Sequence, residues 1–377
     1  MEILSNLNLW GGGWTGWIIP FLFLLSVVVF FHELGHFLIA RWCRVRVLVF
    51  SIGFGPELFG FNDRHGTRWK VAAIPLGGYV KFFGDENAAS VPDQAAVAGM
   101  TPAERRDSFF FKPLGQRAAI VAAGPLANFL LAIVIFSVVF MFYGRQITAP
   151  RVDVVQSGSP AAAAGFQPGD LIVAIDGRPI ESFNEVQRVV RLRPEQPLTI
   201  VVDRGGVRQT LQATPGVGKD PFGNRIGQLG ISRPIGPGDV KVQKVGVLDA
   251  VAMGVGETWM VIEQTMIYLY EVIVGRQAAD QLGGPIRIAQ VAGQVATLGF
   301  LPILNLAAVL SVSIGLLNLF PIPLLDGGHL LFYAIEAVRG RPLSERAQEI
   351  GFRIGLAVVL MLMIFATYND IRPWVRL

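Results

Sequence analysis

The sequence is poor in cysteine and in charged residues. Cys43 is the single cysteine among 377 residues, which excludes an intrachain disulfide and a cluster of thiolate ligands. A bound transition metal would therefore need nitrogen and oxygen ligands. Charged residues make up only 16% of the chain and hydrophobic residues 52%, and the mean hydropathy is +0.50. These values exclude an ordinary soluble domain and predict a membrane protein.

Long apolar runs predict four membrane spans. They cover approximately residues 17–40, 120–142, 301–320 and 354–366. No lysine or arginine precedes the first run, and this run is long enough to cross a bilayer. We therefore interpret it as a retained span rather than a cleaved signal peptide.

The few basic residues predict how the spans are oriented. The net charge is only +4, and arginines gather after the first run, before the second, and between the third and the fourth. By the positive-inside rule these loops are cytoplasmic, so both termini and the long middle segment lie on the other side. Basic residues placed beside spans in this way give no sign of nucleic-acid binding.

One further stretch, residues 251–274, is apolar but carries three glutamates, Glu257, Glu263 and Glu271. A fifth span here would reverse the third run relative to its flanking arginines. We therefore interpret the stretch as an amphipathic helix that lies at the membrane interface.

Two segments have the character of β-structure. Residues 150–234 contain short runs such as "LIVAIDG" and "PLTIVV" between Gly, Pro and Asp turn signals, which predict a small soluble domain. In a cytoplasmic loop, "TRWKVAAIPLGGYVKFF" alternates in polarity and predicts a β-hairpin that turns at Gly77 and Gly78.

These features predict a membrane α-helical bundle of about four transmembrane helices, with an inserted α+β domain and a membrane-associated β-hairpin in the cytoplasmic loop. The expected boundaries are 1–150 for the first part of the membrane core, 151–235 for the inserted domain, 236–300 for amphipathic interfacial helices and 301–377 for the rest of the membrane core.

Two histidines and a glutamate interrupt the first apolar run. In "HELGH", His32 and His36 are four residues apart, so on a helix they share one face about 6 Å apart along the axis. Such a pair can bind one zinc ion, and Glu33 is placed to take a proton from a water whose pKa zinc lowers to about 7. The alternative is a chance HExxH whose histidines only pack. Because an ionisable side chain at mid-bilayer costs about 2.5 kcal/mol or more, we favour a bound cation as the partner of all three groups.

A third ligand is expected in "NLFPIPLLDGGH". Pro321 and Pro323 break the helix there, and non-helical backbone at membrane depth is tolerated where it lines protein or a water-filled cavity. Asp326 is our candidate ligand, but His329 competes with it and the spacing does not decide between them. His65 lies in a polar loop, and we interpret it as a solvated residue.

Five motifs together resemble the site-2 protease family, in particular its bacterial branch that cleaves anti-sigma factors within the membrane. They are "HELGH", "SIGFGP" at 51–56, "PLGGYVKFFGDEN" at 75–87, "GPLANF" at 124–129 and "NLFPIPLLDGGH" at 318–329. The resemblance implies that His32, His36 and Asp326 bind zinc, that Glu33 is catalytic and that Asn318 assists substrate or transition-state binding.

The resemblance also has implications for the rest of the chain. Residues 151–235 would form a PDZ domain on the periplasmic side of the inner membrane, opposite the zinc, and would bind peptide or protein ligands. The "PLGGYVKF" hairpin would offer a strand edge to an unwound substrate. For "GPLANF" we expect only close helix packing through Gly124 and Ala127 and one interhelical hydrogen bond from Asn128, without a catalytic role.

The sequence therefore predicts a zinc-dependent intramembrane endopeptidase that cleaves transmembrane segments already shortened by an earlier cleavage. Two alternatives stay open at this stage. A membrane metal transporter also places His and Asp in spans, but needs no adjacent glutamate. A scaffold without catalytic activity would capture peptides through its PDZ domain alone.

Overall fold

The computed structural model describes residues 15–84, 99–219, 225–234, 240–275 and 283–375. By internal contacts the chain divides into two compact units. The first unit comprises residues 1–137, 251–265 and 282–377, and the second comprises residues 138–250 and 266–281.

Among the described residues, four helices are long and apolar enough to cross a membrane, as the sequence predicts. They are α2 (Thr15–Trp42), α5 (Leu114–Tyr143), α10 (Phe300–Asn318) and α12 (Glu345–Val375). Most of them extend beyond the apolar runs because helical backbone continues into polar flanks. Helix α8 (Val247–Ile273) is not one of these four, and its interpretation as an interfacial helix stays a prediction.

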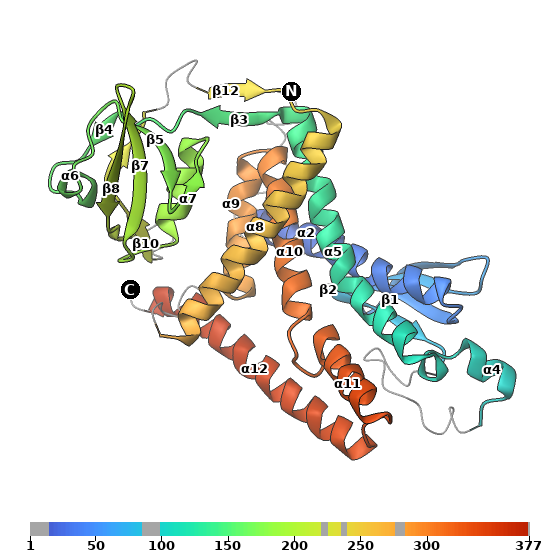
Figure 1. The fold of residues 1–377 in the computed structure, drawn as a ribbon. Helices are drawn as coiled ribbons and strands as arrows, with labels where there is room; N and C mark the ends of the chain where they lie inside the picture. Colours follow the sequence, from blue (N-terminus) through green and yellow to red (C-terminus); the bar gives the residue numbers. More distant parts are fainter. Residues whose placement is uncertain (1–14, 85–98, 220–224, 235–239, 276–282, 376–377) are drawn as a thin grey trace. The chain divides into compact units, whose positions relative to one another are not determined.

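Shorter helices complete the first unit. Helix α4 (Pro102–Asp107) begins with a capping box in which Thr101 and Glu104 bond reciprocally, and a 3₁₀ turn, η1 (Phe109–Phe111), follows. Helix α9 (Pro285–Thr297) packs against α2. Figure 1 shows α10 leading through a short connection into α11 (Asp326–Arg339).

Strands β1 (Val47–Asn62) and β2 (Arg68–Phe82) form the antiparallel pair that the sequence predicts in the first loop. The chain reverses in two places, and one of them adjoins the predicted turn. The first reversal is at residues 63–67, where the Asp63 carboxylate accepts hydrogen bonds from the backbone N–H groups of His65 and Thr67. The second reversal lies within β2, because Ile52 pairs with both Val71 and Gly78, so the predicted turn at Gly77 and Gly78 falls at its end. His65 is exposed in the first turn. The last residues of the "PLGGYVKFFGDEN" motif, 85–87, lie outside the described part.

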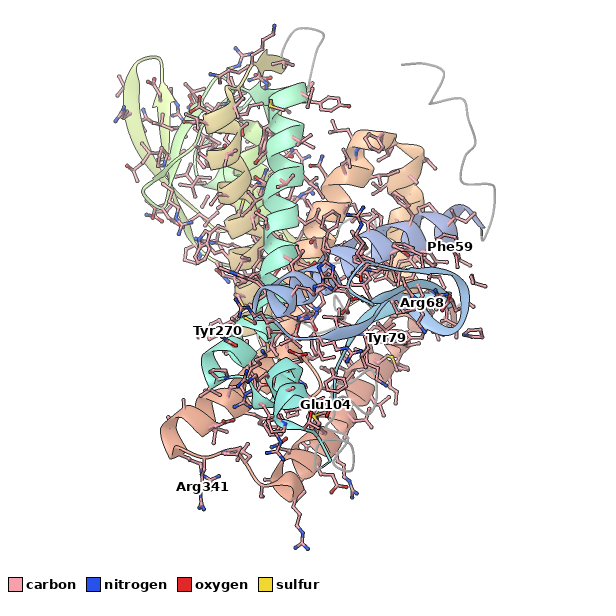
Figure 2. All side chains as sticks on the ribbon, turned by 90° about the vertical axis from the view of Figure 1, so that its right-hand side faces the viewer. Phe59, Arg68, Tyr79, Glu104, Tyr270 and Arg341 are labelled. Atoms are coloured by element: carbon pink, nitrogen blue, oxygen red, sulfur yellow. The ribbon has the colours of Figure 1, made fainter. Side chains whose placement is uncertain are left out.

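The register of this pair shows that both strands fold over themselves. Phe50 pairs with both Val80 and Trp69, so the first half of β1 lies between the two halves of β2. Phe61 also pairs with Trp69, so the second half of β1 lies on the other side of the first half of β2. The last residues of β2 therefore form one edge of this small sheet. Phe59, Arg68 and Tyr79 mark the sheet in Figure 2.

The second unit is built around a four-stranded sheet with the order β6-β5-β7-β8. Its hydrophobic core includes Ile172, Leu198 and Ile200, to which the amphipathic helix α7 adds Val186. Figure 1 shows β5, β7 and β8 side by side with α7 close to them. The elements of this unit are β3 (Arg145–Thr148), β4 (Val154–Val155), α6 (Pro160–Ala163), β5 (Leu171–Ile175), β6 (Arg178–Pro179), α7 (Phe183–Arg191), β7 (Leu198–Arg204), β8 (Val207–Ala213), β9 (Gly216–Lys219), β10 (Arg225–Gln228), β11 (Ile231–Ser232) and β12 (Val240–Gln243).

One buried ion pair joins the residue before β5 to the last residue of β7. The Arg204 guanidinium donates to both oxygens of Asp170, over 2.7 and 2.8 Å, and the Asp170 side chain is 0% exposed. Burial by itself raises the pKa of Asp170, but Arg204 and the Gln167 N–H together hold that pKa below its usual value. Because the folded pKa is the lower one, the stabilisation is present above about pH 3.9 and is lost as the pH falls through the folded value.

We expect Asp170→Asn to lower the free energy of unfolding of this unit by about 2 kcal/mol, since the fully buried Asp170 side chain loses its charge-assisted hydrogen bonds to the partly exposed Arg204 guanidinium. Amide hydrogen exchange in β5 and β7 of the detergent-solubilised full chain would measure this. Glu195→Gln is the matched control, because it breaks an exposed pair with Arg225 that is worth at most about 1 kcal/mol. Equal protection in the two variants would contradict the expected effect.

Candidate metal centre

The first half of the centre comes from one turn of α2. His32 and His36 project from the same face of this helix, and their Nε2 atoms lie 3.3 Å apart. Both side chains are largely buried, with 11% and 12% exposed. Two imidazole nitrogens therefore face one point inside an apolar helix bundle.

Asp326, at the start of α11, supplies the third group. Its Oδ2 lies 3.2 Å from His32 Nε2, and its Oδ1 lies 3.5 Å from His36 Nε2. Ligands bound tetrahedrally to zinc at about 2.1 Å lie about 3.4 Å from each other, so these separations fit a zinc ion. Asp326 Oδ2 is also buried with no hydrogen-bond partner among the described residues. An unsatisfied buried carboxylate oxygen is what a bound cation would pair with.

A broken helix brings Asp326 to this position. Helix α10 ends at Asn318, and the chain runs through Pro321 and Pro323 before α11 begins at Asp326. Leu324 has a left-handed φ of 92°, which is costly for a branched residue. The two prolines and this bend place the carboxylate at the first residue of α11.

Helix α5 packs against the histidine face of α2. A Cβ at Gly124 would lie 2.9 Å from His32 Cε1, so only glycine leaves room for the ring. The His36 Nδ1–H donates to the Ile120 carbonyl oxygen over 2.8 Å. Because a carbonyl only accepts, this bond assigns the proton to Nδ1 and leaves the Nε2 lone pair facing Asp326. Asn128 Nδ2 lies 3.2 Å from His32 Nδ1 in the same packing.

Glu33 is held by the β1–β2 sheet. The Val80 backbone N–H donates to its carboxylate. Gly78 permits the close approach, since a Cβ there would lie 3.1 Å from Glu33 Cγ. The carboxylate is therefore fixed beside the histidines by main-chain atoms of the edge strand.

These residues line a pocket of about 230 Å³, which is room for several waters at about 30 Å³ each. Asn318, His329 and Tyr333 line the same pocket as His32, Glu33, His36 and Asp326. Of the two candidates for the third ligand, Asp326 is the one grouped with both histidines, and His329 is not. The ring of His329 contacts Phe352 instead, with centroids 5.5 Å apart.

Sequence reasoning did not find the groups that support these side chains. The Ile120 carbonyl and the Val80 N–H are main-chain atoms, which the sequence does not mark. For Asn128 a signal was present, since an amide inside an apolar run needs a partner. The predicted interhelical hydrogen bond is there, but its partner is a histidine of the candidate metal centre.

Four membrane helices and a buried His-His-Asp cluster beside a glutamate are the features of a membrane zinc metalloprotease. Comparison with known proteins agrees, because residues 20–362 match peptidase family M50. A Rhizobium meliloti protein named as a zinc metalloprotease is 54% identical over 355 residues, which are 93% of this chain and 95% of that protein. Metalloprotease MmpA of Caulobacter vibrioides is 44% identical over 384 residues, covering 95% of this chain and 96% of its own.

The chain therefore belongs to peptidase family M50, the site-2 proteases. The resemblance inferred from the five motifs and the prediction of a zinc cofactor are confirmed. The protein is a membrane zinc metalloprotease.

Proposed function

We propose that this protease hydrolyses peptide bonds within transmembrane segments, with His32, His36 and Asp326 as the zinc ligands. The observation that carries the proposal is the convergence of these three side chains inside the helix bundle, 3.2 to 3.5 Å apart, with Glu33 beside them. When bound, zinc would polarise the scissile carbonyl and make a water more acidic.

Glu33 is the general base in this proposal. It follows His32 directly and lines the pocket with the ligands, so it can accept a proton from the attacking water. The same carboxyl group then gives a proton to the leaving amine. Val80 N–H keeps the carboxylate oriented between these two steps. Asn318, at the end of α10, lines the pocket where it can donate its amide N–H to the substrate carbonyl.

The edge of the β1–β2 sheet is the proposed site for an extended substrate. The Phe83 N–H donates a hydrogen bond to the carbonyl oxygen of Arg46, the residue before β1. Alternation along the strand then turns the N–H groups of Gly78, Val80 and Phe82 away from β1, and these three residues line the pocket. The Val80 N–H is bonded to Glu33, which leaves those of Gly78 and Phe82 for a substrate. A substrate segment that unwinds could pair with this edge by β-augmentation.

The sheet also has the surface of a membrane-associated element. Leu58 and Phe59 are 71% and 68% exposed, and Phe61 and Leu76 are exposed as well. Apolar side chains gathered on a small sheet fit contact with lipid or with a transmembrane substrate. Together with the arginines of the flanking loops, this supports a pocket that opens toward the cytoplasmic side of the inner membrane.

Residues 151–235 are proposed to form a periplasmic PDZ domain. The observation that supports this is a groove of about 170 Å³ beside α7, lined by Phe183, Val186 and the segment 226–231. A groove between a helix and a strand end suits a bound peptide. The proposed substrates are membrane proteins such as anti-sigma factors whose outer parts have already been trimmed.

Purified protein in proteoliposomes would test the function. We expect a single-span peptide with a short outer end to be cut inside its apolar segment, with the cut located by mass spectrometry. A zinc chelator should abolish cleavage, and added Zn²⁺ should restore it. Cutting only in soluble loops would contradict the intramembrane assignment. A metal transporter would instead carry Zn²⁺ across the vesicle without cleaving the peptide, and an inactive scaffold would only bind it.

A further inference from the structure

Helix α5 presents three groups to the two histidines at a regular spacing. Ile120, Gly124 and Asn128 follow one another at intervals of four residues, so they lie on one face of the helix. Ile120 contacts His36 and Asn128 contacts His32, so α5 and α2 run in opposite directions here.

The two histidines are thus supported in parallel ways. The Nδ1 of His36 is hydrogen-bonded to the Ile120 carbonyl oxygen. Gly124 leaves room for the rings of both histidines. His32 has its Nδ1 on the side-chain amide of Asn128, 3.2 Å away. Each ring therefore has a polar group of α5 behind it and turns its Nε2 toward Asp326.

The buried side-chain amide of Asn128 costs free energy at this position unless its hydrogen bonding has a role. Its side chain belongs to a fully buried residue, 0% exposed, inside a membrane helix. Its Oδ1 has no hydrogen-bond partner among the described residues, while its Nδ2 faces His32. The two ends of an amide are exchanged by a simple flip, and the flipped amide would place its oxygen on His32 Nδ1.

Resting on the metal site proposed above, we infer that Asn128 is a positioning residue for His32. Its amide oxygen accepts the Nδ1–H of His32, and this hydrogen bond fixes the tautomer whose Nε2 lone pair faces the zinc. A ligating histidine commonly donates its other N–H to an acceptor in this way, and loss of that acceptor weakens metal binding by about 10–100-fold. In this role Asn128 does for His32 what the Ile120 carbonyl does for His36.

Zinc affinity of the purified full chain, measured by competition with a chromophoric chelator, tests this inference. Asn128→Leu keeps the volume but has no acceptor, and it should weaken zinc binding about 10–100-fold. Asn128→Asp keeps an acceptor and cannot donate, so it should bind zinc at least as tightly as the native protein. A role in packing alone predicts the opposite order, because a buried carboxylate disturbs an apolar interface more than leucine does.

Two further variants complete the experiment. Ser311→Ala removes a hydrogen bond to the Asn128 backbone carbonyl without touching His32, and its zinc affinity should be unchanged. Asp326→Ala reports whether the His-His-Asp site holds the metal at all. Native affinity in Asn128→Leu, or an Asp variant as weak as the Leu variant, would overturn the inference and leave the metal site standing. Full zinc binding by Asp326→Ala would overturn the metal site, and this inference with it.

Discussion

Replacing Asp326 with alanine is expected to leave the purified protein without zinc. The native chain should contain about one zinc per molecule, held by two imidazoles and one carboxylate. Removal of the carboxylate leaves two neutral ligands and takes away the negative charge that balances the ion in an apolar interior. We expect an affinity loss of more than about 100-fold, since even groups behind the ligands contribute 10–100-fold. Elemental analysis after gel filtration would measure the bound zinc.

Two matched variants are the controls for this measurement. Glu336→Gln removes another carboxylate of α11, one that pairs with Arg117 over 2.6 Å, and it should keep its zinc. His329→Ala removes the competing candidate and should also keep its zinc, because His329 is not grouped with His32 and His36. If the Asp326 variant retained zinc while the His329 variant lost it, the third ligand would be His329.

The spans and the histidine pair were accessible from the sequence because each depends on local spacing. A helix with HExxH places both imidazoles on one face whatever surrounds it. Four apolar runs of sufficient length likewise predict four helices without reference to their packing. Asp326 was one of two candidates for the third ligand, since an acidic residue after two prolines at the end of a span needs a partner, but the spacing did not decide between it and His329.

The rest of the site depends on contacts between segments far apart in the chain. Ile120 and His36 are 84 residues apart, and Asn128 and His32 are 96 apart. The double pairing of Phe50 with Val80 and Trp69 is also invisible to a pattern of alternating polarity, which gives strands but not their order. Gly77 and Gly78 lie where β2 turns back, as their pattern predicts, but that Gly78 also makes room for Glu33 is not visible in the sequence.

Through these contacts, three elements of the first unit hold the functional side chains of α2. Its histidines are supported by α5, its glutamate by β2, and its metal-facing side by α11. The edge strand that holds Glu33 also lines the pocket. In the proposed function, a substrate paired with that edge would have its scissile bond beside Glu33, so one strand would serve both substrate capture and catalysis.

Glu33→Gln is expected to abolish cleavage while the protein keeps its zinc. The glutamine has nearly the same shape and can still accept the Val80 N–H, so the fold of the sheet against α2 should remain. It cannot take a proton from water at neutral pH, and loss of a general base lowers the rate by about 100-fold to 10,000-fold. Cleavage of a single-span peptide and zinc content should be measured on the same preparation. Glu349→Gln, on the exposed side of α12, is the control that should remain active. A Glu33→Gln protein that cleaves at the native rate would contradict the assigned base, and one that lost its zinc would point to a structural role for this carboxylate instead.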